Sequence, residues 1–333
     1  MDIFVGVIVG LFVLMLLVTL HELGHFVAAR RNGVRVLEFG IGFPPRAIAW
    51  VKDPKTKKWK RSKKKDWGKP QEGLIFSLNW LPIGGFCQMD GESAFDERKG
   101  TFGAASFWAK TKILFAGVAM NWLVAFLILT VLAWTGMPEF LPGQFSVESD
   151  TRVEESTEIV VVTTDDEGNE VRTPQKIRYS TWSAPIVGAG ITLQITGQTF
   201  QGLGELLWNL ISGVGRLFSF DASVRESGQE AISSVGESVS GPVGIVGVLF
   251  PTFTSAGPSN LAYLAAIISI SLACMNVLPI PALDGGRWFL IGLYKLRRKK
   301  LTKEIEEKIV ARAFVVLLAL MLIVTVLDIT RFF

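Results

Sequence analysis

Four long apolar segments, separated by polar connections, dominate the pattern of hydrophobic and polar positions along the chain. They run from Ile3 to about Ala29, from Ile113 to Trp134, from Leu261 to about Leu278 and from Ala313 to Leu327. A helix of roughly 20 apolar residues crosses about 30 Å of hydrocarbon. Hydrophobic residues make up 49% of the chain and the mean hydropathy is +0.39, which is too apolar for an ordinary soluble enzyme. The pattern predicts an α-helical integral membrane protein with about four transmembrane helices.

The polar connections alternate in charge. Between Arg30 and Lys110 the chain has 17 basic and 8 acidic residues, and between Met137 and Pro258 it has 6 basic and 15 acidic residues. The short connection from Lys295 to Arg312 is basic again. Because basic connections stay in the cytoplasm, we expect the N-terminus and the C-terminus on the extracytoplasmic side. We interpret the lysine run of the first connection as a contact for anionic membrane lipids and not for nucleic acid.

Two connections also contain stretches that are typical of β-strands. VRVLEFGIGFPPRAIAW (34–50) and GLIFSLNWLPIGGFCQM (73–89) predict a membrane-associated β-hairpin or sheet. In the acidic connection, a β-like stretch from Glu158 to Thr163 precedes a DDEGNE turn and a second β-like stretch. Apolar residues recur at helical spacing between Ala184 and Phe218, which predicts an amphipathic helix, either on the outer membrane surface or packed against the protein. These segments predict a small extracytoplasmic α+β insertion.

The only two histidines of the chain lie in the sequence HELGH, at the inner end of the first apolar segment. His21 and His25 are four residues apart and share one face of a helix, where both can bind one metal ion with Glu22 beside them as a general base. Ionisable side chains are costly inside a bilayer unless a partner satisfies them. A bound divalent cation would satisfy these three, so the sequence predicts a metal site within the membrane.

A third metal ligand must be a carboxylate or a cysteine, since no other histidine exists. The candidate is Asp284, the only acid in SLACMNVLPIPALDGGRWF at the inner end of the third apolar segment. Pro279 and Pro281 interrupt helical pairing there, which predicts a partly unwound stretch. Counted along the two helices from their outer ends, His21 and Asp284 both reach the inner half of the membrane.

HELGH in a first membrane helix and NVLPIPALDGG in a later one resemble the motifs of the site-2 protease family of intramembrane zinc metalloproteases. In layout the chain is most similar to the bacterial branch that cleaves anti-sigma factors, represented by the regulator-of-sigma-E protease. LPIGGFCQMDGE resembles the membrane-associated β-hairpin of that branch, and SGPVGIVGV resembles its segment before the third span. The resemblance implies Zn²⁺ as the cofactor, His21, His25 and Asp284 as its ligands, and Glu22 as the catalytic base.

The resemblance also implies regulated intramembrane proteolysis, in which peptide bonds in or near transmembrane segments are hydrolysed. The implied partners are transmembrane protein or peptide substrates, such as anti-sigma factors or signal-peptide remnants, and an upstream site-1 protease. The implied location is a bacterial-type inner (cytoplasmic) membrane. Asn276 resembles an asparagine that contacts the substrate backbone in the family. The hairpin strands, with Gly84 and Gly85, would hold an extended substrate by edge pairing.

We expect three regions: residues 1–136 as the first half of a membrane protease core, 137–258 as the extracytoplasmic insertion, and 259–333 as the second half of the core. The insertion departs from the bacterial branch, whose members carry PDZ domains there. Here about 45 residues, 138–183, occupy that place and contain no carboxylate-binding loop of the PDZ type. We therefore expect a degenerate or truncated PDZ-like segment.

A non-catalytic membrane adaptor or carrier that binds metal is the alternative interpretation. A carrier would need polar residues along several spans, and the second and fourth apolar segments offer few. An inactive adaptor would normally have lost one of the four motif residues, and all four are present. The sequence therefore favours the protease.

Overall fold

Among the residues that the structure describes, four helices are long and apolar enough to cross a membrane. The computed structural model describes residues 2–62, 73–91, 96, 98–138, 145–164, 170–219, 221–238, 241–299 and 301–332. Within these residues the four candidate spans are α1 (Asp2–Arg31), α2 (Phe107–Thr135), α7 (Pro258–Val277) and α9 (Lys303–Phe332). They contain the four apolar segments predicted from the sequence, so the helical membrane-protein class is supported.

The last span, α9, begins ten residues before the apolar segment that predicted it. Its first turns, KEIEEKIVAR, are amphipathic: Glu306 is buried, whereas Glu304 and Glu307 are exposed. Acidic residues in a first helical turn interact favourably with the helix dipole. An average over hydropathy cannot detect such turns, because their charged positions cancel the apolar ones.

Contacts within the chain divide it into two compact units. One unit comprises residues 8–123 and 272–319, and the other comprises residues 1–7, 124–271 and 320–333. Every residue of the predicted metal site lies in the first of these units. The predicted regions 1–136, 137–258 and 259–333 follow the course of the chain and stay a prediction.

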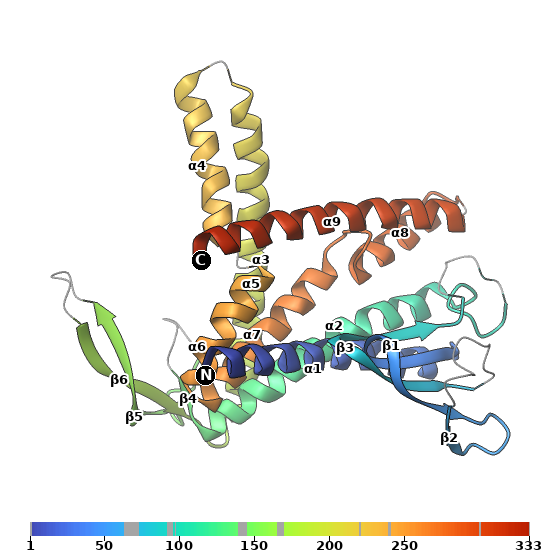
Figure 1. Ribbon diagram of the computed structural model, residues 1–333, viewed down its shortest axis with the longest axis horizontal. Helices are drawn as coiled ribbons and strands as arrows, with labels where there is room; N and C mark the ends of the chain where they lie inside the picture. Colours follow the sequence, from blue (N-terminus) through green and yellow to red (C-terminus); the bar gives the residue numbers. More distant parts are fainter. Residues whose placement is uncertain are drawn as a thin grey trace. The chain divides into compact units, whose positions relative to one another are not determined.

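The unit with residues 8–123 contains a three-stranded antiparallel sheet in the order β2-β1-β3, which confirms the predicted hairpin (Figure 1). Its strands are β1 (Val36–Lys52), β2 (Trp59–Arg61) and β3 (Ile75–Met89). Ile41 of β1 pairs with Leu78 and also with Gly85. The first half of β1 therefore lies between the two halves of β3, and the stretch 85–89 forms an outer strand.

A hydrophobic core joins this sheet to three helices. It packs the end of α1, the two long strands and the start of α2 against α8 (Asp284–Leu296). The buried members are Ala29, Val34, Val36, Phe39, Cys87, Met89, Phe102, Ile113, Leu114, Ile291 and Leu301. Burial of this apolar surface stabilises the positions of α1, α2 and α8, the three helices that carry the predicted site and its neighbours.

The other unit contains a second sheet, ordered β4-β6-β5. Its strands are β4 (Met137–Pro138), β5 (Arg152–Thr164) and β6 (Glu170–Tyr179), so the predicted β-like stretches are confirmed. The predicted DDEGNE turn lies, apart from Glu170, outside the described residues.

Two long helices follow this sheet and form a helical hairpin (Figure 1). The first, α3 (Ala184–Leu217), confirms the predicted amphipathic helix, and it buries Val187, Ile191 and Ile195. The second, α4 (Ala222–Ser238), was not predicted. Its sequence ASVRESGQEAISSVGES contains few apolar residues, so a helix was not recognised there, and packing against α3 stabilises it.

A carboxylate at the far end of α9 holds the start of the helical run that precedes α7. This run comprises α5 (Pro242–Gly244), η2 (Ile245–Leu249) and α6 (Phe250–Ser255). The Asp328 carboxylate accepts hydrogen bonds from the backbone N–H groups of Gly241, at 3.1 Å, and Gly244, at 2.7 Å. The first N–H groups of a helix have no partner within it, so this buried carboxylate satisfies them.

Candidate metal centre

The side chains of His21, His25 and Asp284 converge on one point. The Nε2 atoms of the two histidines are 3.1 Å apart, and the Asp284 Oδ2 atom lies 3.1 Å from the first and 3.2 Å from the second. Both imidazoles are buried, with exposed fractions of 7% and 6%. Residues separated by more than 250 positions thus present three donor atoms as a nearly equilateral triangle. The sequence predicted this grouping.

The spacing and chemistry of these donors fit a zinc ion. Two ligand atoms about 2.0–2.2 Å from a tetrahedral Zn²⁺ lie roughly 3.3 Å apart, and the three observed separations are 3.1–3.2 Å. Two imidazole nitrogens and one carboxylate oxygen form a usual catalytic donor set, which leaves the fourth coordination position open. The Glu22 carboxylate also lies within 4.8 Å of the histidine nitrogens.

Close packing of α1 and α2 sets the positions of the two imidazoles. A methyl group on Gly24, the glycine of HELGH, would overlap the carbonyl oxygen of Ala116. A methyl group on Gly117 would lie 2.6 Å from Cε1 of His21 and from Nε2 of His25. Only glycine fits at these positions, because real Cβ atoms do not approach other atoms so closely. Sequence reasoning missed Gly117.

Two further groups of α2 contact the remaining ring nitrogens. The Nδ1 atom of His25 lies 2.8 Å from the backbone carbonyl oxygen of Ile113, to which its N–H donates. The Nδ1 atom of His21 lies 3.3 Å from the side-chain amide of Asn121. The first contact fixes the tautomer of His25 and leaves its Nε2 for the metal, and both contacts orient their rings. Ile113, Gly117 and Asn121 are spaced by four residues, so one stripe of α2 faces HELGH, and that spacing was the available sequence signal.

The Asp284 carboxylate is placed by a break between two helices. Helix α7 ends at Val277 and α8 begins at Asp284, so the predicted unwinding around the two prolines is confirmed. A methyl group on Gly285 would overlap the carbonyl oxygen of Val277, and one on Gly286 would overlap that of Ile280. The two glycines after Asp284 therefore let the chain fold back tightly, which brings the carboxylate to the first turn of α8.

The outer strand of the sheet runs along α1 beside the glutamate of HELGH. The Glu22 carboxylate accepts a hydrogen bond from the backbone N–H of Cys87. Gly84, with a φ of +76°, packs against Val18, and Gly85 packs against Thr19. Both predicted glycines therefore contact the turn of α1 that precedes HELGH.

Asn276, the third residue predicted to bind substrate, is half-buried in the last turn of α7. The substrate contacts of Asn276, Gly84 and Gly85 stay predictions.

Comparison with known proteins decides the family. The sequence profile of peptidase family M50 matches residues 9–62 and 63–321, which is nearly the whole chain. The chain belongs to peptidase family M50. Its relatives include a predicted zinc metalloprotease of Clostridium perfringens, which is 27% identical over 346 aligned positions that cover 94% of this chain and 95% of the relative.

A second relative of the M50 peptidase, a predicted zinc metalloprotease of Fusobacterium nucleatum, is 25% identical, and the alignment covers 98% of this chain and 99% of the relative. The zinc metalloprotease RasP of Bacillus licheniformis is 23% identical, with 95% of this chain and 97% of RasP covered. These matches confirm the predicted resemblance, the metalloprotease class and Zn²⁺ as the implied cofactor.

Proposed function

We propose that this M50 peptidase is an intramembrane zinc metalloprotease that hydrolyses peptide bonds in or near transmembrane segments. One observation carries the proposal: the donor triangle is built on residues 21 and 25 of α1, inside a candidate membrane span of residues 3–31. A peptide bond that reaches Glu22 must therefore come to this helix at membrane depth. Anti-sigma factors and signal-peptide remnants are substrates of this kind, and an upstream site-1 protease would shorten the former beforehand.

The residues of the site have separate chemical roles in this proposal. His21, His25 and Asp284 would hold Zn²⁺, which would polarise the scissile carbonyl and lower the pKa of a water molecule. Glu22 accepts the proton of the attacking water and delivers it to the leaving amine. The hydrogen bond from Cys87 and the burial of the site hold the Glu22 carboxylate in place during these transfers.

The sheet offers a way to present the scissile bond. A transmembrane helix hides its carbonyl groups in hydrogen bonds, so the substrate must be extended before attack. One edge of the stretch 85–89 pairs with β1, and the N–H of Cys87 points from the other edge to Glu22. A substrate strand pairing with that second edge would lie beside the base. Gly84 and Gly85, which pack against Val18 and Thr19 of α1, would hold this edge beside Glu22, and Asn276 would hydrogen-bond to the substrate backbone.

The orientation in the membrane completes the proposal. The charge pattern places both termini outside and the basic first and third connections in the cytoplasm of a bacterial-type inner membrane. Exposed apolar side chains on α1 and α9, such as Phe4, Phe12 and Leu322, would contact lipid.

The proposal predicts that Glu22→Gln abolishes cleavage while zinc stays bound, because the base is lost and the ligands remain. The purified full chain would be incubated with a panel of single-span peptides, and products would be read by mass spectrometry with and without a zinc chelator. General-base catalysis contributes about 10²–10⁴-fold, so cleavage should fall by at least that factor.

The matched control is Glu205→Gln, an exposed glutamate on α3, which should cleave like the unaltered chain. Cleavage retained in Glu22→Gln would refute Glu22 as the base. A chain that binds zinc but cleaves no peptide in any form would favour the metal-binding adaptor instead.

A further inference from the structure

A cavity of about 630 Å³ opens beside the Asp284 carboxylate, within the unit that holds the metal site. Four parts of the chain line it: Leu37 of β1, the end of β3 with Gly91 and Asp96, the break before α8 with its first turn, and the first two turns of α9. The charged residues that line it are Asp96, Asp284, Arg287, Lys303, Glu306 and Glu307. It is large enough for one or two amino-acid side chains.

The outer strand leads from the base to this cavity. Gly84 contacts α1 at Val18, whereas the N–H of Asp90 donates to the carbonyl oxygen of Arg35, beyond the end of α1. The strand therefore runs toward the basic end of α1. Gln88, which lines the cavity, is exposed, while the side chains on either side of it are buried. A substrate strand that pairs with this edge would pass Asp284 and continue into the cavity.

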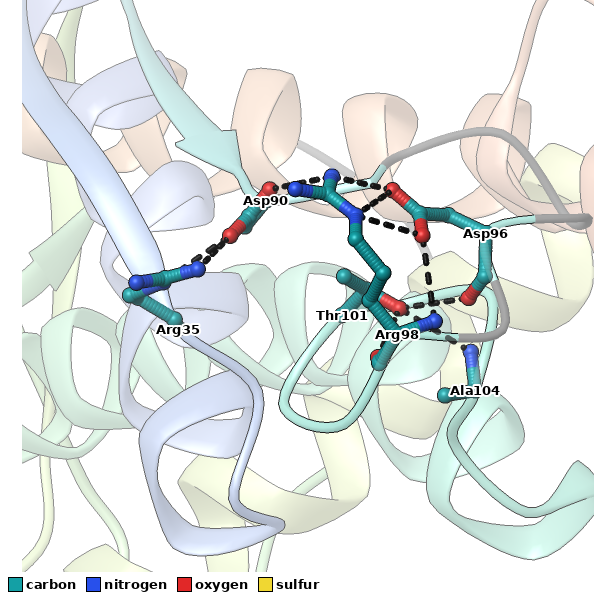
Figure 2. A network of polar contacts seen from close by, with 6 residues as sticks. All are labelled: Arg35, Asp90, Asp96, Arg98, Thr101 and Ala104. Carbon is teal, nitrogen blue, oxygen red and sulfur yellow. Dashed lines mark hydrogen bonds and ion pairs between the residues drawn. The ribbon is translucent and has the colours of Figure 1, made fainter. Parts of the chain in front are cut away.

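An ion-pair network anchors one carboxylate of the cavity wall. Figure 2 shows Arg98 between Asp90 and Asp96, with Arg35 on the far side of Asp90. The hydroxyl of Thr101 donates to the backbone carbonyl of Asp96 at 2.6 Å. A hydrogen bond with Arg98 lowers the pKa of Asp96 to about 2, so Asp96 is ionised at neutral pH and its charge is balanced by Arg98.

The opposite wall holds two carboxylates of different accessibility. Glu306 is buried and lies 3.4 Å from Nε of Arg287, whose guanidinium stacks 4.8 Å from the ring of Phe102. Glu307 lies 3.7 Å from Nζ of Lys303, and both of these side chains are about two-thirds exposed. Solvent screens such a pair, so the Glu307 carboxylate can turn toward an incoming cation.

We propose that this cavity is a substrate subsite for a basic side chain, and that Glu307 is a residue that determines this specificity. Arg98 pairs with Asp96 and Arg287 pairs with the buried Glu306, so Glu307, whose pair with Lys303 is exposed, is the lining carboxylate that can turn toward a substrate cation. Membrane spans carry Lys and Arg at their cytoplasmic ends, which is the side where the proposed topology places α8 and the start of α9. The subsite deepens the proposed function and rests on it.

The test compares single-span peptides that carry Lys, Glu or Leu at one position and are otherwise identical. This position lies two to four residues from the scissile bond, on its cytoplasmic side. Cleavage is measured as kcat/KM with the zinc-loaded full chain in nanodiscs. Binding of the same peptides is measured separately as Kd with Glu22→Gln, so that the subsite is read without catalysis. The variant is Glu307→Lys. The matched control is Glu304→Lys, an exposed glutamate in the same part of α9 that does not line the cavity.

We expect the unaltered chain to prefer the Lys peptide over the Glu peptide by about fivefold in both measurements, which is the effect of a partly screened charge pair. Glu307→Lys should reduce this ratio by about tenfold, since attraction becomes repulsion, and added salt should weaken the preference. Glu304→Lys should keep it.

The subsite would be overturned if the unaltered chain bound and cleaved the Lys and Glu peptides equally well. It would also be overturned if Glu307→Lys and Glu304→Lys changed the Lys preference to the same extent. A binding preference that Glu307→Lys removes, without cleavage of any peptide, would support the subsite and refute the proteolytic function.

Discussion

Each imidazole of HELGH uses both of its ring nitrogens. One nitrogen of each ring joins the donor triangle, and the other meets a group of α2, a backbone carbonyl for His25 and a side-chain amide for His21. The motif alone therefore does not make the site, because an imidazole that can rotate does not hold its lone pair toward a metal. The stripe of α2 that faces HELGH supplies the orientation.

The clearest consequence at this scale is that Gly117→Ala should weaken zinc binding. The added methyl group would lie within 2.7 Å of atoms of both imidazoles, so the rings or the two helices must shift. We expect a loss of zinc affinity of roughly tenfold or more, the range found when the groups that orient ligands are removed. Equilibrium dialysis against a zinc buffer would measure it.

Gly197→Ala is the matched control, since open space surrounds that glycine on α3 and zinc affinity should not change. Alanine favours helices over glycine by about 1 kcal/mol, so a loss confined to Gly117→Ala cannot come from helix propensity. Unchanged affinity in Gly117→Ala would contradict the packing described for α1 and α2.

At the scale of elements, the sequence predicted those whose pattern is carried by hydrophobic residues. The four spans, the strands around Gly40 and Gly84, and helix α3 follow from apolar runs or periodicity. Helix α4 and the first turns of α9 could not be found in this way, because polar residues dominate them and tertiary packing decides their structure. Helix α8 was hidden by LPIPALDGG, whose prolines and glycines suggest only a turn.

Some residues of the site could likewise be predicted from the sequence, and others could not. His21, Glu22 and His25 were predicted from the residue types and spacing of HELGH, and Asp284 from its place at the inner end of the third apolar segment together with the family resemblance. Gly117 was missed because the four-residue spacing of Ile113, Gly117 and Asn121 gains its meaning only once the packing of α1 and α2 is known. The fold supplies that contact.

For the whole molecule, the charge pattern predicts which connections face the cytoplasm. Both cysteines are free and buried, so Cys87→Ser with Cys274→Ser gives a background for single-cysteine labelling. In intact cells, Glu154→Cys on β5 should react with a membrane-impermeant maleimide. Lys55→Cys, in the turn between β1 and β2, should react only after permeabilisation, because basic connections remain inside. Labelling of Lys55→Cys in intact cells, with Glu154→Cys labelled only after permeabilisation, would contradict the proposed orientation.

The most direct measurement of the central account is the zinc content of the purified chain at limiting free zinc in two variants. If the donor triangle holds the metal, Glu22→Gln should retain about one zinc ion per chain, since three protein ligands remain in an open catalytic site. Asp284→Asn should lose zinc affinity by more than the roughly 10–100-fold that removal of an outer hydrogen bond costs. Equal zinc content in the two variants would remove Asp284 from the metal site and contradict the account.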